Sequence, residues 1–406
     1  MLSAEENDLL TRVGPGTPMG ALMRRYWIPA LFADRIATPD CTPVRVQLLG
    51  ESLVAFRDSK GRAGLLDEQC PHRTASLYFG RNEECGLRCV YHGWKFDVDG
   101  KCVDMPSEPP ASNFQDKVRI TAYPCHEAGG VVWAYMGPAD LKPEFPPLEW
   151  TLLPADQLYA TRHVQECSWL QGLEGGFDAS HLAFLHRGTD AVNANISPSR
   201  HETLRTGFGM IVGTGREAIE GEIRWGSNLM ILPFHKVFAT RPNGAHMWVP
   251  MDDENTMLYS IDFKPSGPFT EEELKLSRSH LHIHTENIPG TDRAVLNRDN
   301  DYGIDRQLQA SGASFTGMHG LAIQDSAIQE SMGPIANRTR EHLGVSDTAI
   351  IQIRKMLLEV VRAHEAGETP PGLNAADYRA RSTRFVLPTD GDFIASVEAQ
   401  LARQIP

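Results

Sequence analysis

The sequence has little of what several classes of protein need. It contains no run of about 20 apolar residues, the length that a helix needs to cross a bilayer. Lys and Arg number 39 against 52 Asp and Glu, so the formal net charge is −13. Clustered cations for binding nucleic-acid phosphates are therefore not expected. These shortages argue against a nucleic-acid partner and a membrane span, and leave small molecules or proteins as the expected partners.

Cysteine is also scarce. Seven in 406 residues is an odd and modest number that argues against a secreted disulfide framework. Residues 1–10 are acidic and lack the basic and then apolar layout of a secretion signal. Both observations predict a cytoplasmic protein. In a reducing compartment, a paired Cys/His pattern indicates a metal site rather than a crosslink.

What the chain does have is the balance of a globular protein, with 41% hydrophobic and 22% charged residues and a length that predicts two domains. Residues 1–26 look like two short helices around a Gly/Pro turn. Residues 27–137 hold short alternating runs bounded by Gly, Asp or Pro, which predict an all-β domain. Residues 138–150 are rich in proline and are expected to link it to a second domain, 151–406.

The second domain mixes strand and helix patterns, so we expect an α+β fold with an antiparallel sheet. Strand-like alternation falls at 204–215, 222–233 and 246–263, and helical periodicity falls at 270–284, 323–332 and 347–367. The segment from Cys167 to His186 also has helical spacing, around acidic and histidine positions.

The first motif that carries chemistry lies in the all-β domain. Cys70 and His72 are followed, after sixteen intervening residues, by Cys89 and then His92. A hairpin between the two halves would bring two loops face to face, each with one thiolate and one imidazole. Such a set suits either a tetrahedral zinc or a two-iron cluster with two Cys on one iron and two His on the other. Zinc sites more often repeat similar spacings, whereas these two halves differ.

The pattern C-x-H-x16-C-x2-H, followed by Gly and Trp, resembles the Rieske [2Fe-2S] motif. The resemblance implies that Cys70 and Cys89 hold the inner iron, and that His72 and His92 hold the outer iron near the surface. It also implies a fairly high reduction potential, because histidine ligation raises it. The cysteines that match no ligand position are expected to be structural thiols: Cys41, Cys85, Cys102, Cys125 and Cys167.

The second motif, D-x2-H-x4-H, consists of Asp178, His181 and His186. On a helix Asp178 and His181 would be neighbours, whereas His186 needs a break or a helix end to turn inward. Two imidazoles and one carboxylate on one face of a metal form the facial triad of mononuclear non-haem Fe(II) oxygenases, which leaves positions open for O2. By itself this pattern is more often buried structure than a metal site.

The two motifs in this order resemble the large subunit of Rieske non-haem iron oxygenases, whose catalytic domain has a helix-grip, START-like fold. Likeness to the phthalate dioxygenase and aryl-ether O-demethylase branch covers residues 6–30, 169–186, 248–255 and 324–335. The resemblance implies that His181 and His186 bind iron. It also implies that Asp178 is the bridging acid, which links this iron to a Rieske histidine of a neighbouring subunit. A homotrimer, or a stacked pair of trimers, follows from the same resemblance.

The family takes its third iron ligand, a carboxylate, from a later helix. Asp325 lies where the phthalate dioxygenase branch has this ligand, and Glu330 and Asp347 are weaker candidates. The other interpretation of Asp325 is a charge near a helix N-terminus, favoured by the helix dipole. Many family members have Asn four residues before the bridging acid, but this chain has Glu174. We interpret Glu174 as a residue that supports the ligands or the fold.

The resemblance further implies a reductase, with flavin and a plant-type ferredoxin domain, that passes NAD(P)H electrons to the Rieske cluster and on to a mononuclear Fe(II) that activates O2. The expected reaction is ring dihydroxylation of an aromatic, carboxylated substrate, and the alternative is oxidative O- or N-demethylation of an aryl methyl ether or amine. The arginines in segments that could reach such a carboxylate are Arg187, Arg200, Arg205 and Arg224. Two other classes stay open, a Rieske electron carrier fused to a ligand-binding domain and a zinc-containing binding module.

Overall fold

The computed structural model describes residues 1–109, 111–187, 199–240, 242–378 and 380–404. The chain forms two compact units. The large unit comprises Met1–Val13, Thr17–Met19 and Pro146–Pro406, and the small unit comprises Gly14–Gly16 and Gly20–Phe145. The change from the small to the large unit falls inside the proline-rich segment 138–150, and the N-terminal residues group with the C-terminal part of the chain.

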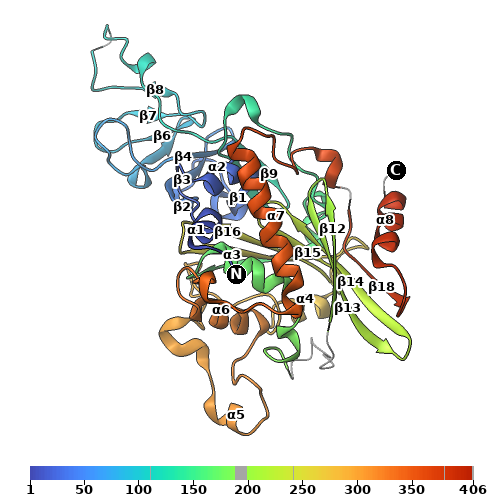
Figure 1. Cartoon of the computed structure of the whole chain (residues 1–406). Helices are drawn as coiled ribbons and strands as arrows, with labels where there is room; N and C mark the ends of the chain where they lie inside the picture. Colours follow the sequence, from blue (N-terminus) through green and yellow to red (C-terminus); the bar gives the residue numbers. More distant parts are fainter. Residues whose placement is uncertain (110, 188–198, 241, 379, 405–406) are drawn as a thin grey trace. The chain divides into compact units, whose positions relative to one another are not determined.

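The small unit consists of antiparallel sheets made from short strands (Figure 1), with the orders β1-β10-β9, β2-β3-β4 and β5-β6-β7-β8. The strands span β1 Trp27–Phe32, β2 Val44–Leu48, β3 Glu51–Arg57, β4 Ala63–Asp67, β5 Arg81–Glu83, β6 Gly86–Arg88, β7 Lys95–Phe96, β8 Cys102–Asp104, β9 Cys125–Ala128 and β10 Val131–Tyr135. Apolar strand residues such as Val54, Phe56 and Leu87 form one buried cluster with Cys70 and Cys89. The all-β fold expected for this part of the chain is confirmed.

Two tight hairpins shape the small unit. Strands β2 and β3 are joined by Leu49 and Gly50, with φ of +48° and +79°, and β5 and β6 are joined by Glu84 and Cys85, with φ of +50° and +61°. Two successive left-handed residues make the type I′ turn that matches the twist of the flanking strands. Cys85 therefore forms the turn of the hairpin that leads into Cys89.

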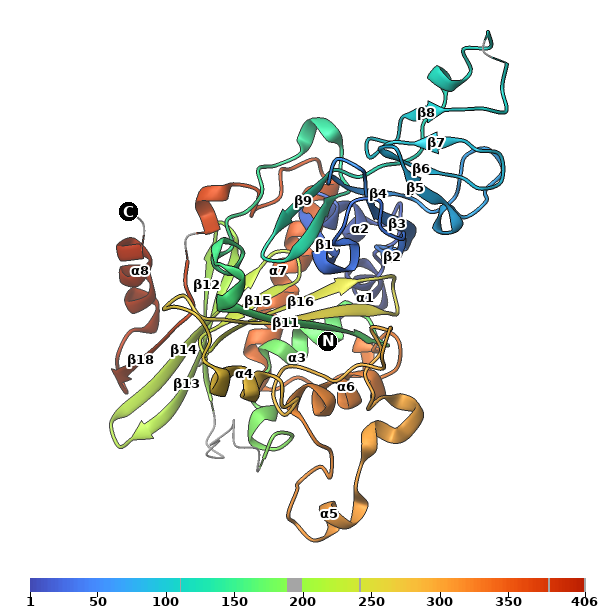
Figure 2. The ribbon, with the colours of Figure 1, turned by 180° about the vertical axis from the view of Figure 1, so that it is seen from behind.

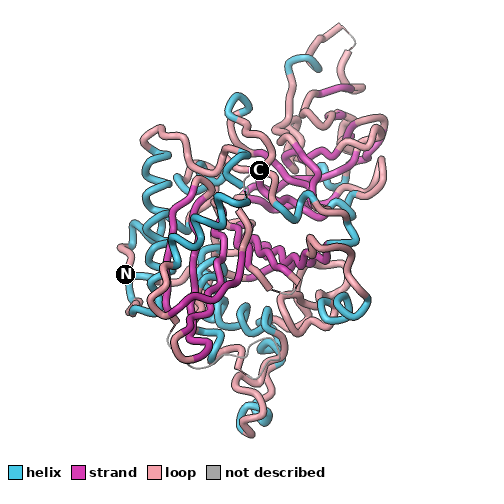
Figure 3. The backbone as a smooth tube through the Cα atoms, turned by 90° about the vertical axis from the view of Figure 1, so that its right-hand side faces the viewer, coloured by secondary structure: helices cyan, strands magenta, loops and turns pink. Residues whose placement is uncertain are grey.

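The large unit is organised around an antiparallel sheet, whose strands are drawn in magenta in Figure 3. The strand order of this sheet is β11-β17-β16-β15-β14-β13-β12. The strands span β11 Leu158–Gln165, β12 Arg200–Thr206, β13 Gly209–Ile219, β14 Glu222–Ile231, β15 His235–Phe238, β16 Asn243–Pro250, β17 Thr256–Phe263 and β18 Thr383–Pro388. The long strand β14 pairs with β18 along residues 222–227 and with β15 along residues 229–231. This sheet confirms the α+β class expected from the sequence.

Helices cover the sheet on both faces (Figures 1 and 2). The helices of the chain span α1 Ala4–Thr11, α2 Pro18–Met23, α3 Trp169–Phe177, α4 Glu271–Ser277, α5 Arg306–Ala310, α6 Leu321–Ser331, α7 Thr348–Glu365 and α8 Phe393–Gln404. Helix α3 packs against β15 and β16, α7 packs against β12 and β13, and the two helices contact each other. At the start of α8, Phe393 packs on Trp225 and Phe385, on the opposite face. Among the described residues, no helix combines the length and the apolar character needed to span a bilayer.

Helix α3 approaches the sheet closely because it contains glycine where it crosses β16. A Cβ atom at Gly172 or at Gly176 would lie 2.2 Å from the ring of Trp248. The indole of Trp248 therefore occupies the space that side chains would otherwise fill. This close packing fixes the end of α3, from which Asp178 and the two histidines of the second motif follow.

The first helix of the chain is fastened to the large unit. The hydroxyl of Ser3 accepts from the backbone N–H of Glu6 and the Glu6 carboxylate accepts from Ser3 in return, both at 3.1 Å, which caps α1. The indole N–H of Trp169 on α3 donates to the carbonyl of Leu10 at 3.1 Å. Residues 1–13 thus belong structurally with the helices around α3.

A buried ionic network explains Glu174, whose role the sequence left open. The carboxylate of Glu174 on α3 accepts from Arg338 at 2.9 Å and from Arg354 on α7 at 2.6 Å. Arg354 also binds Glu341, and Arg338 donates to Asn7 on α1 at 3.1 Å. Burial opposes ionisation of Glu174, but the two guanidinium groups lower its pKa below the ordinary value. Glu174 therefore ties α1, α3 and α7 together and does not face the two histidines.

Replacing Glu174 should destabilise the large unit. In Glu174→Gln, Arg338 keeps its charge in a fully buried position but loses its carboxylate partner. Breaking a buried pair in this way costs about 3–5 kcal/mol of unfolding free energy. Urea unfolding followed by circular dichroism would measure the loss. The matched control is Glu359→Gln, which breaks an exposed pair with Arg205 and should cost below about 1 kcal/mol. Equal effects of the two changes would contradict the assignment.

Candidate metal centres

In the small unit, the two Cys/His loops repeat one backbone turn. The N–H of Thr74 donates to the carbonyl of Cys70 at 2.8 Å, and the N–H of Gly93 donates to the carbonyl of Cys89 at 3.0 Å. Each cysteine N–H in turn donates to the carbonyl five residues later, at 2.9 and 2.8 Å. Thr74 and Gly93 both have positive φ, +56° and +80°. The two halves of the motif, unequal in sequence, therefore share a common local structure.

Within these loops the thiols lie inside and the imidazoles lie toward the surface. Cys70 and Cys89 are 1% and 3% exposed, whereas His72 and His92 are partly exposed. The two imidazole ring centres are 4.4 Å apart, and His72 also stacks on Trp94 at 4.2 Å. The structure thus brings all four residues of the first motif to one place.

The chemistry of these four residues fits a bound iron-sulfur cluster. Nδ1 of His72 is buried and has no hydrogen-bond partner among the described residues, although buried imidazole nitrogens are normally paired. Burial, together with the neighbouring Cys89 thiol, raises the pKa of the Cys70 thiol to about 11. Thiolate ligands at this place therefore need a metal cation to stabilise their charge.

In the large unit, the residues of the second motif follow the C-terminal end of α3 and are not part of this helix. The helix ends at Phe177, because Asp178 has the extended backbone angles φ −71° and ψ 118°. A short 3₁₀ turn, His181–Ala183, follows. The prediction that Asp178 and His181 are neighbours on one helix is therefore wrong. The two side chains still meet, with Asp178 Oδ2 at 3.4 Å from His181 Nδ1, because the chain turns back after the helix end.

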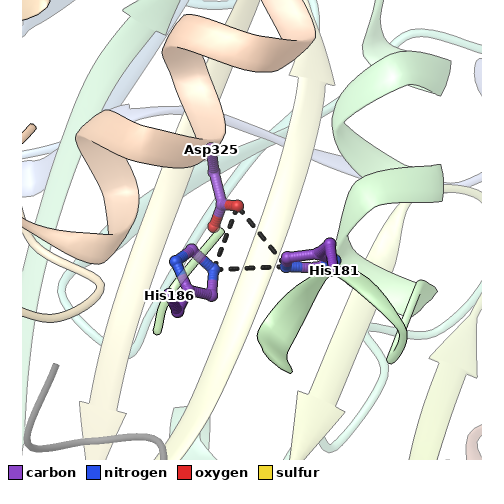
Figure 4. Close-up of side chains that lie close together, drawn as sticks. All are labelled: His181, His186 and Asp325. Atoms are coloured by element: carbon purple, nitrogen blue, oxygen red, sulfur yellow. Dashed lines mark hydrogen bonds and ion pairs between the residues drawn. The ribbon is translucent and has the colours of Figure 1, made fainter. Parts of the chain in front are cut away.

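The structure brings His181, His186 and Asp325 together (Figure 4). The Nε2 atoms of the two histidines are 3.2 Å apart, and Oδ1 of Asp325 on α6 lies 3.2 Å from His186 Nε2 and 3.5 Å from His181 Nε2. The two weaker candidates have other partners. Glu330 accepts from the hydroxyl of Tyr302 at 2.6 Å, and Asp347 accepts from a backbone N–H near the start of α7.

Neighbouring side chains fix which nitrogen of each imidazole faces the centre of this group. The amide nitrogen of Gln324 donates to Thr316 and to Met318, both at 3.0 Å, so its Oε1 faces His186 Nδ1 at 2.7 Å. His186 then donates from Nδ1, as His181 does toward Asp178, and both Nε2 atoms present lone pairs to the centre. Sequence reasoning missed Gln324, since a glutamine on a helix carries no signal before its partner is known.

The charge of Asp325 and the lone pairs of His181 and His186 favour a cation at the point where these three side chains meet. Burial disfavours the charged form of Asp325, yet its hydrogen bond with His186 and the nearby imidazoles lower its pKa. Burial likewise opposes protonation of His186, but Asp325 raises the His186 pKa. Two nitrogen lone pairs and a carboxylate oxygen that converge in this way fit a divalent transition metal with open positions, in the manner of a facial triad.

The arginines considered as substrate ligands lie elsewhere. Arg187, Arg200, Arg205 and Arg224 are all exposed. Arg205 pairs with Glu359 at 2.8 Å, and Arg200 donates to a backbone carbonyl. Two partly buried cations lie near the end of α3 instead: Arg216, which donates to the carbonyl of Ala179, and Lys236 on β15, which donates to the carbonyl of Gly176. Neither was selected from the sequence.

Comparisons with protein families match both units. Residues 26–124 match the family described as the Rieske [2Fe-2S] domain. Residues 134–205 and 231–393 match the family described as LigXa C-terminal domain like. The two matches cover the loops of the first motif, and the segments that carry the second motif and Asp325.

Curated relatives match over nearly the whole chain. The oxygenase subunit of 3-chlorobenzoate-3,4-dioxygenase from Comamonas testosteroni is 38% identical, over 99% of this chain and 99% of the relative. The phthalate 4,5-dioxygenase oxygenase subunit of Pseudomonas putida is 40% identical, over 95% and 92%. The 5,5'-dehydrodivanillate O-demethylase oxygenase subunit of a Sphingobium species is 33% identical, over 92% and 84%.

Solved structures share the fold at lower identity. Dicamba monooxygenase aligns with a TM-score of 0.62 and 17% identity, over 85% of this chain and 99% of that one. The oxygenase of carbazole 1,9a-dioxygenase, solved with its ferredoxin, aligns with a TM-score of 0.60 and 19% identity, over 89% and 95%. With the relatives and family matches, this makes the chain an O2-dependent oxidoreductase with a Rieske cluster and a mononuclear iron. The chain belongs to the Rieske non-haem iron oxygenases, in the branch of the phthalate dioxygenase and aryl-ether O-demethylase oxygenase subunits.

Proposed function

We propose that the chain is the terminal oxygenase of a system that oxidises a carboxylated aromatic compound by ring dihydroxylation. The observation that carries this proposal is the convergence of His181, His186 and Asp325 in a chain that also holds a Rieske motif. The relatives named for 3-chlorobenzoate and phthalate support the substrate class. The triad argues against the alternative of an electron carrier without a second iron.

The proposed ligand assignment follows the two groups of side chains. Cys70, His72, Cys89 and His92 would hold the Rieske cluster, and His181, His186 and Asp325 would hold the mononuclear iron. When bound, the cluster supplies single electrons and the iron supplies O2 activation. The protein's own part is to keep both imidazole Nδ1 protons in place, through Gln324 and through Asp178, so that the Nε2 atoms stay available.

We assign Asp178 as the bridging acid between this iron site and the Rieske histidine of a neighbouring copy in a homotrimer or a stacked pair of trimers. Its Oδ1 accepts from the backbone N–H of Ser180 at 2.7 Å, and its Oδ2 lies beside His181. The side chain stays 31% exposed, which leaves room for a partner. Burial opposes ionisation, but the contacts with His181 lower the pKa of Asp178, so it is a carboxylate at neutral pH.

The proposed electron donor is a reductase with flavin and a plant-type ferredoxin domain. Exposed apolar residues at the tip of the second cluster loop support a docking role, since Val90 and Tyr91 are 57% and 54% exposed beside His92. The cytoplasmic location expected from the cysteine usage stays a prediction.

Oxidative demethylation is the second candidate reaction, and the similarity to the dehydrodivanillate O-demethylase subunit favours it. The two reactions differ in product. Ring dihydroxylation yields a cis-dihydrodiol, whereas oxidation of a methyl ether or methylamine releases formaldehyde. Incubation with NAD(P)H, a reductase and either an aromatic acid or its methoxy derivative, followed by product analysis, separates them. Absence of both products would overturn the proposed function.

Metal analysis of anaerobically purified protein should find about three irons and about two acid-labile sulfides per chain, since one Rieske cluster and one mononuclear iron add to that ratio. The visible spectrum should be that of a red-brown protein. About two irons, persisting after Fe(II) is added back, would leave only an electron carrier. Zinc without sulfide would remove both iron assignments.

Gln324→Leu should weaken the mononuclear site without touching the cluster. His186 would lose the acceptor that orients its ring, and loss of such a partner typically costs about 10–100-fold in metal affinity. Fe(II) titration of the iron-depleted protein measures the effect, while the visible spectrum monitors the cluster. Asp325→Ala is the stronger comparison and should abolish Fe(II) binding at this site. Retained iron in Asp325→Ala would place the third ligand elsewhere.

Asp178→Asn should keep both metal sites and lose most turnover. An asparagine oxygen can still accept from Ser180, but the carboxylate that couples the two centres is gone. We expect turnover to fall about 10–100-fold with unchanged iron and sulfide content. Asp390→Asn, at an exposed turn after β18, is the control for loss of one negative charge. Near-normal turnover in Asp178→Asn would remove the bridging role.

A further inference from the structure

Lys236 is a cation placed on the inner face of the sheet. Along β15 the residues His235 and Val237 are buried, while Lys236 and Phe238 alternate with them and remain partly accessible. The ammonium group of Lys236 donates to the carbonyl of Gly176, in the last turn of α3. Lys236 therefore points toward α3, on the side of the sheet where the chain goes on to Asp178 and the histidines.

No ion pair satisfies this charge within the part of the chain that the structure describes. Carboxylates lie farther than 4.0 Å from the Lys236 nitrogen among the described residues, and Gly176 supplies a neutral acceptor. Two buried arginines of the large unit differ from Lys236 in this respect, since Arg338 and Arg354 both bind Glu174. A charge surrounded by protein without a counter-ion is costly, so such a group usually has a ligand or a catalytic task.

Aromatic side chains lie beside the ammonium group of Lys236. Its nitrogen lies 4.9 Å from the ring centre of Phe238 and 5.5 Å from that of Phe177. His246 pairs with Lys236 directly across the strands β15 and β16, and its ring stacks on Phe238 at 5.2 Å. Burial, with the repulsion of Lys236, lowers the pKa of His246 to about 3, so this imidazole is neutral. The surroundings thus combine one cation with rings that can contact a planar ligand.

The cation also lies within electrostatic range of the iron site. Burial lowers the pKa of Lys236 to about 8, and the Asp325 and Asp178 carboxylates act against that lowering. At neutral pH the group is therefore mostly protonated. The same two carboxylates belong to the triad and to the bridging position, which puts Lys236 in the neighbourhood where a substrate must lie to be oxidised.

We propose that Lys236 anchors the carboxylate of the aromatic substrate, with the substrate ring lying against Phe238 and His246. The proposal rests on the proposed function and deepens it. It names one internal lysine, in place of the exposed arginines, as the group that binds the substrate carboxylate. An ammonium group can donate to a single carboxylate oxygen from many directions, unlike the two-pronged grip of a guanidinium. The site is therefore matched to aromatic acids as a class, and neutral esters of the same ring lack the group that Lys236 binds.

Calorimetric titration of anaerobic holoenzyme, without reductase, tests this without turnover. The probes are benzoate, 3-chlorobenzoate and phthalate, with methyl benzoate as the neutral counterpart. The variants are Lys236→Met, which keeps length and removes charge, and Lys236→Arg, which keeps charge. Arg205→Met is the control, because Arg205 is exposed and paired with Glu359. Iron and sulfide are measured on every sample.

We expect Lys236→Met to weaken binding of the three acids about 30-fold or more, the usual effect of removing one partner of a desolvated charge pair. Methyl benzoate should bind Lys236→Met as it binds the unchanged protein. Lys236→Arg should recover most of the affinity for acids, and Arg205→Met should change nothing. Unchanged affinity for acids in Lys236→Met, equal loss for acids and ester, or no binding of any acid by the unchanged protein would each overturn the proposal.

The metal analysis separates this proposal from the proposed function. If the holoenzyme carries its iron and cluster and forms oxidised product, yet Lys236→Met binds acids normally, the anchor alone is wrong. If Lys236→Met loses iron and binds acids and ester equally poorly, Lys236 serves to balance Asp178 and Asp325, and the anchor is overturned. If the unchanged protein lacks the second iron, the proposed oxygenase function is wrong, whether or not the acids bind.

Discussion

The catalytic part of the molecule depends on where helix α6 lies beside α3. Asp325 comes from α6, whereas the two histidines follow α3 in a distant part of the sequence. Buried glutamines hold these elements together. Gln171 on α3 donates to the carbonyls of Gln329 and Gly333, both at 2.9 Å, and Gln165 on β11 donates to the Gln329 side chain at 2.9 Å. An unsatisfied buried amide costs about 1–3 kcal/mol, so a shift of α6 that misplaced the carboxylate would also break this network.

The two metal centres are assembled in different ways. The proposed cluster ligands lie within residues 70–92, on two loops whose backbone turns are nearly the same, and a short hairpin joins them. Closing so short a segment costs little chain entropy. The proposed iron site combines residues 178–186 with Asp325, so it needs the sheet, α3 and α6 in place before these side chains meet. One centre is thus a local structure, and the other is a product of the whole large unit.

This difference decides how much the sequence could predict. Cysteine and histidine in short, unequal spacings carry their chemistry with them, and alternating apolar runs located the strands around them. The end of α3 was not predictable, since the helical spacing continues through Asp178 while the backbone does not. Gln324 and Lys236 are ordinary polar residues until the elements opposite them are known. The expected cations were arginines, but these are exposed, whereas Lys236 of β15 is partly buried beside the end of α3.

The first helix of the chain belongs to the unit that is completed last. Helix α1 packs against α3 and α7. In the sequence, the residues of the small unit come after α1 and before both of these helices. The small unit is thus inserted into the large one. At a synthesis rate of about 5–20 residues per second, α1 leaves the ribosome well before α7 exists to pack against it. The small unit has its own buried core and can fold in that interval. During synthesis of each chain, the small unit, which carries electrons, can therefore be folded while the large unit, which activates oxygen, still lacks its C-terminal helices.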